Sequence, residues 1–188
     1  MRRLVPDIGN QTALSVLTRL NRDVHMNDEP NQTAALLAEQ LRDAVTELAQ
    51  SVNTLLESQA SVATLETALE SHDILRDQLT TFSQDDSAIA ALERIELFIT
   101  HQAGDHYRLV HEEFDEQQHN HFMALFARQL LALDGVGPAT ARQLYEQGVY
   151  TPDQFFALTP KELSQLSLPP ASLARLIPLH AHPPHADT

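Results

Sequence analysis

The sequence predicts an all-α protein, and three observations support this prediction. Glycine is scarce, with only 5 among 188 residues, and β-branched residues seldom cluster. Residues 31–103 contain neither Gly nor Pro, which is typical of long helices. Apolar residues in this stretch recur every three or four positions, the spacing of one helix face. We therefore expect a long antiparallel helical hairpin or bundle, coiled-coil-like, followed by a small helical domain.

Composition narrows the functional classes. The chain has no Cys, which excludes disulfides, thiolate metal sites and cysteine nucleophiles together. The sequence contains no run of ~18 consecutive apolar residues, so no transmembrane helix is expected. The first residues lack the apolar core of a signal peptide. A cytoplasmic protein is therefore the expectation.

The formal net charge of −14 is distributed unevenly. Residues 1–22 hold four Arg and one Asp, for +3, whereas residues 23–127 hold four Arg and 20 acidic side chains, for −16. Residues 128–178 balance four basic against four acidic side chains. An acidic body repels a polyanion over ~8–10 Å, the Debye length near physiological salt. Any nucleic-acid contact is therefore expected within the neutral C-terminal part.

Residues 1–27 are expected to form a short helix and a linker. Residues 11–22 place three apolar side chains on one helical face: Ala13, Leu17 and Leu20. The polar residues that follow are typical of a connection. Met26 is a second candidate start of translation, in which case the residues before it would be unrelated to the fold.

Residues 28–127 are expected to form an acidic helical body. A heptad seam runs along its first half, through Leu41, Val45, Leu48, Val52 and Leu55. The seam shifts phase around residues 59–62, like a stammer, and then resumes. We therefore predict a first helical arm over residues 31–82.

A second arm should fold back on the first. Residues 83–86 are typical of a helix stop and restart, and Gly104 and Asp105 break the apolar pattern of the following helix. A further helix is predicted from Asp105 to Leu133. A two-arm hairpin exposes much of its seam, so either the first arm bends into a bundle or two chains pair. We favour self-association through residues 28–127.

A tight turn between two helices is predicted near the C-terminus, in the domain over residues 128–178. Residues 133–144 read Leu-Asp-Gly-Val-Gly-Pro-Ala-Thr-Ala-Arg-Gln-Leu. The two glycines permit φ > 0 or close backbone approach, and Pro138 suits the first turn of a helix. This run resembles the helix-hairpin-helix motif of family X DNA polymerases. The resemblance extends over residues 122–178, with Leu-Pro-Pro at residues 168–170 in place of the Gly-x-Gly of a second hairpin.

The resemblance implies a sequence-independent contact with nucleic-acid backbone. Backbone N–H groups of the turn and the dipole of the following helix favour a phosphate. The implied nucleic-acid-binding residues are Gly135, Val136, Gly137, Ala139, Thr140 and Arg142. Two departures stand out: Gln143 replaces a second basic residue, and the prolines at residues 169–170 remove two donors. Alternatively, the unit packs its helices for contact with a protein.

Ten His raise the question of a metal site. His111, Asp115 and His119 have i, i+4, i+8 spacing, which would suit Zn²⁺ or iron. We favour a solvated polar helix face, because no second helix offers a matching Glu-x-x-His set. His72 and Asp73 form a pair without further partners. No nucleophile elbow, phosphate loop or dinucleotide fingerprint occurs, so no metal, cofactor or enzymatic activity is expected.

These observations predict a non-catalytic adaptor. Its hairpin module would contact nucleic-acid backbone, or a partner associated with nucleic acid. The alternative is a phasin-like scaffold, whose amphipathic helices coat a hydrophobic granule or assemble with a protein partner while the hairpin docks a protein. Residues 179–188, rich in His and Pro, are expected to be disordered.

Overall fold

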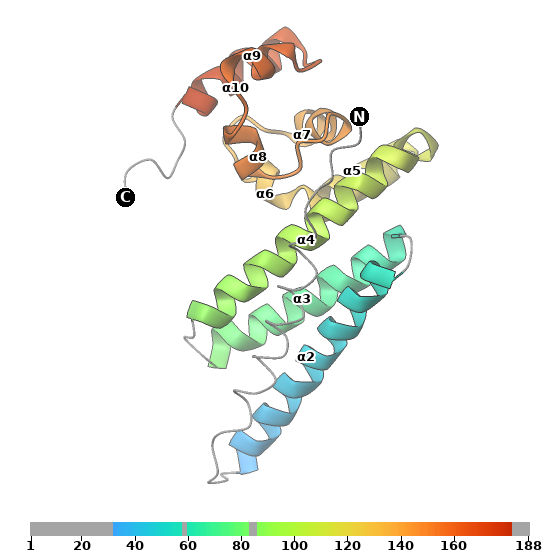
Figure 1. Ribbon diagram of the computed structural model, residues 1–188, viewed down its shortest axis with the longest axis vertical. Coiled ribbons are helices and arrows are strands. Elements are labelled where there is room, and N and C mark those ends of the chain that lie inside the picture. The colour runs from blue at the N-terminus through green and yellow to red at the C-terminus, as the bar shows by residue number, and fades with distance from the viewer. Residues whose placement is uncertain (1–31, 58–59, 83–85, 182–188) are drawn as a thin grey trace. The chain divides into compact units, whose positions relative to one another are not determined.

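The computed structural model describes residues 32–57, 60–82 and 86–181, and every regular element within them is helical (Figure 1). The all-α prediction is confirmed. In chain order the elements are α2 (Gln32–Glu57), α3 (Val62–Phe82), α4 (Asp86–Val110), η1 (His111–Glu113), α5 (Glu116–Phe126), α6 (Arg128–Leu131), α7 (Pro138–Glu146), α8 (Pro152–Phe156), α9 (Pro160–Gln165) and α10 (Pro170–Ala181). Among the described helices, none combines the length and apolarity needed to cross a membrane. The helix expected in residues 1–27 lies outside the described residues.

The chain divides into two compact units, Met1–Ile99 and Thr100–Thr188, and the division falls within α4. The sequence placed the domain boundary later, at residues 127 and 128. The structure instead groups the end of α4 and all of α5 with the C-terminal helices. The hydroxyl of Tyr145 on α7 donates to the carbonyl of Phe126 at the end of α5, and the Tyr107 and Tyr145 rings lie 6.0 Å apart.

The first unit is an antiparallel bundle of α2, α3 and the beginning of α4 (Figure 1). The Ser51 and Ser71 hydroxyls lie 3.3 Å apart across α2 and α3. Arg76 donates to Glu96 at 3.0 Å across α3 and α4. The core is aliphatic and consists mainly of Leu48, Val52, Leu55, Leu65, Leu75, Leu92, Ile95 and Ile99.

The first arm is not one helix over residues 31–82, as the sequence suggested, because α2 ends at Glu57 and α3 begins at Val62. Ser61 and Thr64 cap the start of α3 reciprocally: the Ser61 N–H donates to the Thr64 hydroxyl at 2.9 Å, and the Thr64 N–H to the Ser61 hydroxyl at 3.2 Å. The phase shift in the heptad seam therefore marks a break. Because the arm bends into a bundle, the seam is buried within one chain, and the argument for self-association from an exposed seam no longer applies.

Gly104 does not break a helix, contrary to the prediction, since α4 continues through it to Val110. The ring of Tyr150 packs directly against Gly104, so that a Cβ there would lie 2.5 Å from the ring carbons. The Tyr150 hydroxyl donates to Asp105 at 3.0 Å, next to this contact. A close approach between side chain and backbone, rather than a turn, accounts for this glycine.

The single helix expected from Asp105 to Leu133 is also wrong. It is interrupted after Val110, and Asp115 caps a new helix, α5, through a capping box with Gln118. The interruption turns Phe114 back onto the Tyr107 and Phe122 rings, at centroid distances of 5.9 and 5.8 Å.

Disorder was expected over residues 179–188, but residues 179–181 are helical. α10 continues through Pro178 to Ala181. His180 anchors its last turn, with Nε2 2.8 Å from the carbonyl oxygen of Leu158 and the ring edge-on to Phe155. Residues 182–188 lie outside the described residues.

Candidate nucleic-acid interface

The first hairpin is a tight turn between α6 and α7. Gly135 adopts φ = +81°, a conformation that residues with a Cβ rarely tolerate. The Val136 N–H donates to the Leu133 carbonyl at 3.1 Å, and the Val136 side chain is buried. Val136, predicted as a binding residue, therefore holds the turn together and has no N–H left for a ligand.

The N-terminus of α7 presents unused donors. Gly137 is its N-cap residue and provides no side-chain acceptor, and Pro138 occupies the first position. Within the described residues, the N–H groups of Gly137, Ala139 and Thr140 make no hydrogen bond. By contrast, Asp115, Thr151 and Thr159 close α5, α8 and α9 with capping boxes. Orphan amides at a helix start are suited to an anion.

A second hairpin repeats the first at an offset of 32 residues. Pro170 opens α10 as Pro138 opens α7, since 170 − 138 = 32. Buried residues match in the same register: Val136 with Leu168 before the helices, and Leu144 with Leu176 within them. Placing Leu-Pro-Pro at residues 168–170 opposite Gly-x-Gly, as the sequence pattern suggests, pairs Leu168 with Gly135, which is one position off this register. In the structural register Pro169 takes the place of Gly137, so Ala171 is the donor that corresponds to Ala139.

The two helix starts lie side by side. Thr140 and Ser172 are the third residues of α7 and α10, and their hydroxyl oxygens are 3.5 Å apart. A Cβ at Gly135 would lie 3.5 Å from the Cβ of Arg175, so the second helix also borders the first turn. The positive ends of two helix dipoles therefore meet at one place.

Arg142, the predicted cation of the site, is held by two carboxylates. Its Nη1 donates to Glu116 at 3.2 Å and its Nε to Glu146 at 3.3 Å. Each pair neutralises part of the charge that a phosphate would need. Arg142 therefore links α5 to α7 in this structure.

Arg175 is a candidate site residue that the first hairpin's sequence pattern does not indicate. It is exposed, and among the described residues no carboxylate forms an ion pair with it. In the 32-residue register it matches Gln143, the position where a second basic residue was noted as missing. The second hairpin therefore supplies, at Arg175, the positive charge that the first hairpin lacks at Gln143. Aligning the two hairpins in the sequence is enough to find it.

A cavity of about 580 Å³ lies between α5 and α7. Its lining includes Glu116, His119, Met123, Arg142 and Glu146. The buried His119 ring is 2.7 Å from the Tyr107 hydroxyl through Nδ1. Burial, with a smaller contribution from Arg142, lowers the pKa of His119, and burial raises the pKa of Tyr107 to about 12. Both groups are neutral near pH 7, and their hydrogen bond joins α4 to α5.

The metal hypothesis finds no support in the described residues, where no group of three or more His, Cys, Asp or Glu could hold a metal ion. His111 lies in η1, Asp115 caps α5, and His119 points into the core, so the three do not share one helix. The preferred alternative, a solvated face, is also wrong for His119. His72 is likewise buried, 3.0 Å from Asp73 through Nδ1 and 3.2 Å from the Leu92 carbonyl through Nε2.

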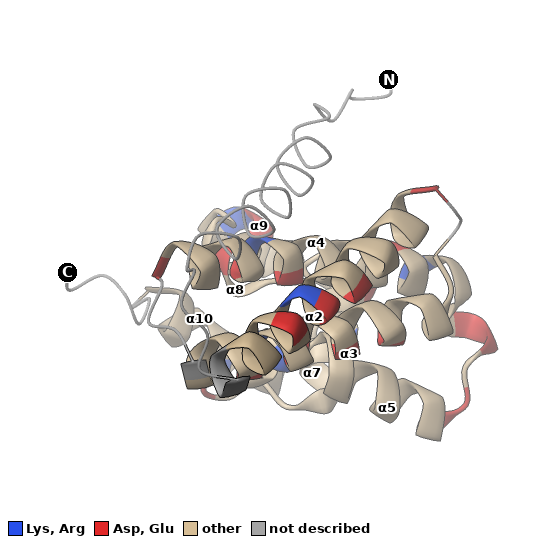
Figure 2. Ribbon diagram, turned by 90° about the horizontal axis from the view of Figure 1, so that it is seen from below, with Lys and Arg blue, Asp and Glu red and all other residues tan. Residues whose placement is uncertain are grey.

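The balance of acidic and basic side chains differs between the first unit and residues 128–178; Figure 2 colours both kinds of residue on the ribbon. The described residues up to Ile99 hold 11 acidic side chains and three basic ones: Arg42, Arg76 and Arg94. Residues 128–178 are balanced at four and four. The paired helix starts thus lie in the least acidic described segment of the chain.

Two hairpins in tandem, each with a proline-started second helix, define a helix-hairpin-helix module. Residues 127–177 match the family model of the SAM-like helix-hairpin-helix tandem. No curated protein and no solved structure matches the chain.

Proposed function

We propose that the C-terminal module contacts the sugar-phosphate backbone of nucleic acid without reading its sequence. The observation that carries this proposal is the 3.5 Å approach of Thr140 and Ser172, which brings two helix N-termini together. Orphan amides at the start of α7 and the exposed Arg175, which borders Gly135, then lie at these paired helix starts, an arrangement suited to a phosphate. The Thr140 side chain, only 8% exposed, holds the two starts together. The match of residues 127–177 to the helix-hairpin-helix tandem supports the same conclusion.

The chain as a whole acts in this proposal as a non-catalytic adaptor. The hydrogen-bonded pair of Tyr107 and His119 is buried and neutral, which suits a structural role better than proton transfer. The acidic bundle repels nucleic acid, so that it leaves backbone contact to the hairpin module and is available for a partner.

A phasin-like scaffold has less support. Coating a hydrophobic granule needs an exposed apolar face, but the apolar stripes of α2, α3 and α4 face one another in the bundle core. The large apolar side chains that are exposed among the described residues are isolated: Leu36, Ile74, Leu109 and Ile177. Single exposed apolar residues are normal on a protein surface.

Gly137→Val tests the backbone contact. No heavy atom lies within 4 Å of a Cβ placed at Gly137, so a valine fits the folded chain but obstructs a phosphate at the start of α7. We expect the Kd for a labelled DNA duplex to rise at least about ten-fold in fluorescence anisotropy. Ala157→Val, at an exposed position at the end of α8, adds a branched side chain outside both helix starts and should bind as the parent does. Equal binding by the two variants would refute the proposed contact.

A further inference from the structure

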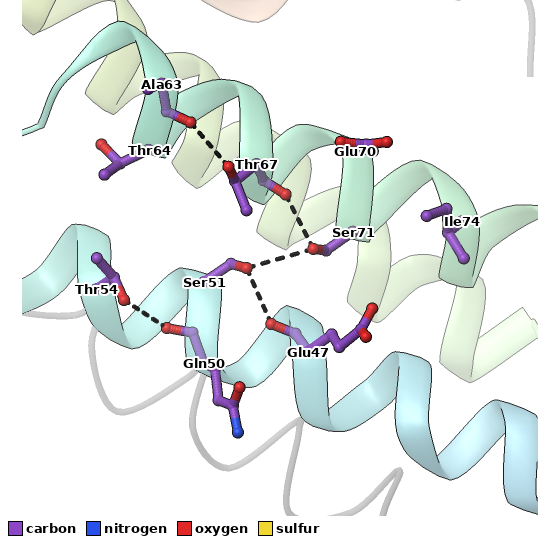
Figure 3. A pocket seen from close by; sticks show the side chains of 10 residues that line it. All are labelled: Glu47, Gln50, Ser51, Thr54, Ala63, Thr64, Thr67, Glu70, Ser71 and Ile74. Carbon is purple, nitrogen blue, oxygen red and sulfur yellow. Dashed lines mark hydrogen bonds between the residues drawn. The ribbon is translucent and has the colours of Figure 1, made fainter.

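A groove runs between α2 and α3 on the surface of the first unit (Figure 3). It has a volume of about 600 Å³, and its lining includes Glu47, Ser51, Thr54, Thr67, Ser71 and Ile74. Small side chains along both walls, such as Ser51, Thr67 and Ser71, allow a further helix to approach α2 and α3 closely. The hairpin of α2 and α3 is thus left with an open side that the described residues do not fill.

The polar groups that line the groove are largely satisfied. Each hydroxyl bonds to a carbonyl one turn earlier in its own helix: Thr54 to Gln50 at 3.0 Å, and Ser51 to Glu47, Thr67 to Ala63 and Ser71 to Thr67 at 2.9 Å. Their aliphatic atoms are therefore available to pack against an apolar partner without leaving donors unpaired. Ile74, 43% exposed, adds apolar surface at one end.

We propose that residues 11–22 of the same chain dock in this groove as a fourth helix. Their apolar side chains, Ala13, Val16, Leu17 and Leu20, recur at helical spacing on one face. The opposite face is polar and includes Arg22. A segment with one apolar stripe and one charged face fits a groove that is lined mainly by Ser, Thr and Ala side chains and by two glutamates.

Length and reach agree with this placement. Twelve helical residues span ~18 Å, and the α3 wall of the groove, residues 63–74, spans ~17 Å at 1.5 Å per residue. Glu47, at one end of the groove, is ~22 Å along α2 from Gln32. The nine connecting residues, 23–31, extend up to ~30 Å. They can therefore return the segment antiparallel to α2.

Charge favours this segment over a second copy of the bundle. Residues 1–22 carry +3, whereas the described residues 32–99 carry 11 acidic and three basic side chains, for −8. Glu47 and Glu70 line the groove itself. A basic segment is attracted to this surface, and a second acidic bundle is repelled from it.

Disulfide formation tests the docking directly, because the chain has no Cys of its own. One variant carries Leu17→Cys with Thr67→Cys in the groove. The matched control carries Leu17→Cys with Thr80→Cys. Both threonines lie on α3, are exposed and bond to their own helix backbone, but 80 lies outside the groove lining. In a glutathione redox buffer, we expect the groove pair to form the intramolecular disulfide with an effective concentration at least about ten-fold above the control. Adding Leu20→Glu should abolish the difference.

Equal effective concentrations in the two variants would overturn the proposal. A predominantly intermolecular disulfide would overturn it as well, since the occupant would then be a second copy. Hydrogen exchange gives an independent test without cysteines. Removing residues 1–22 from the full chain should speed exchange at residues 47–54 and 63–74 more than at residues 89–99 of α4. Unchanged exchange along the groove would contradict the docking.

Discussion

The hydroxyl oxygens of Thr140 and Ser172 lie 3.5 Å apart, which joins the first turns of α7 and α10. The two residues occupy the same position in two hairpins related by an offset of 32 residues. The start of α7 offers backbone N–H groups that no side chain caps. This pair of helix starts and the charges around it should therefore determine binding to nucleic acid.

Arg175 is expected to contribute more to nucleic-acid binding than Arg142. Arg142 already bonds to Glu116 and Glu146, whereas Arg175 is exposed and borders Gly135. Arg175→Ala should weaken binding several-fold at low salt and reduce the slope of log Kobs against log salt by about 1. Arg142→Ala should change both quantities less. Anisotropy titrations at several salt concentrations measure the two slopes, and a larger loss in Arg142→Ala would show that our ranking is wrong.

Releasing Arg142 from its carboxylates should strengthen binding. Glu116→Gln removes one partner and one negative charge beside α7 without changing side-chain size. We expect a lower Kd for the same duplex. Glu112→Gln makes the same charge change at an exposed position of η1 and serves as the control. If the two variants bind alike, the effect is one of net charge, and the specific role of the Glu116 pair is refuted.

Gly104→Ala should destabilise the C-terminal unit. The added methyl group would lie 2.5 Å from the Tyr150 ring, and overpacking of this kind costs ~1–3 kcal/mol. Gly137→Ser adds a side chain where none lies within 4 Å and should leave the free energy of unfolding nearly unchanged. Urea unfolding followed by tyrosine fluorescence reports on this unit, because all three tyrosines belong to it. A Gly104→Ala variant as stable as the parent would contradict the packing argument.

The sequence contained the fold class and the first hairpin, because both depend on local patterns. The absence of Gly and Pro from a long stretch, together with apolar residues at helical spacing, predicts helices whatever they pack against. The interruptions were harder to predict. Gly104 lies within α4 because it meets Tyr150, 46 residues away (150 − 104 = 46), and no local rule contains that contact.

The candidate site was predicted only in part, because some of its features depend on local sequence and others on contacts between distant residues. Gly135 and Gly137 follow from turn chemistry, which is local. The engagement of Arg142 by Glu116 depends on how α5 packs on α7, and the Arg175 contribution depends on pairing two hairpins. Aligning the prolines that start the two helices would have found Arg175 from sequence alone.

Tyrosine ionisation should be suppressed in the folded chain. Burial raises the pKa of Tyr107 to about 12, and also raises the pKa of Tyr145 and Tyr150. These are all the tyrosines present. At pH 10, where an unperturbed tyrosine is half ionised, ultraviolet absorbance should show little tyrosinate in the native chain and about half ionisation in denaturant. Because the folded pKa values are raised, the stability that they contribute is lost as pH rises above 10. Similar titration of native and denatured chains would contradict the burial of these rings.

Acid should destabilise the same unit through one buried and two half-buried histidines. Burial lowers the pKa of His101, His106 and His119 below 6.5. The unfolded chain then binds more protons, so stability is fully present above pH 6.5 and declines as pH falls below it. His119→Gln should flatten this dependence in urea unfolding between pH 7.5 and 5.5. Parallel curves for His119→Gln and the parent would exclude a contribution from His119.

The measurement that tests the account most directly is anisotropy of labelled single- and double-stranded DNA of several sequences with the full chain, over a salt series. We predict binding at low salt that is indifferent to sequence and weakens linearly in log Kobs against log salt, as contacts to phosphates do. Failure of the full chain to bind any of these DNAs at low salt would contradict the account, and the paired helix starts would then be a protein-docking surface.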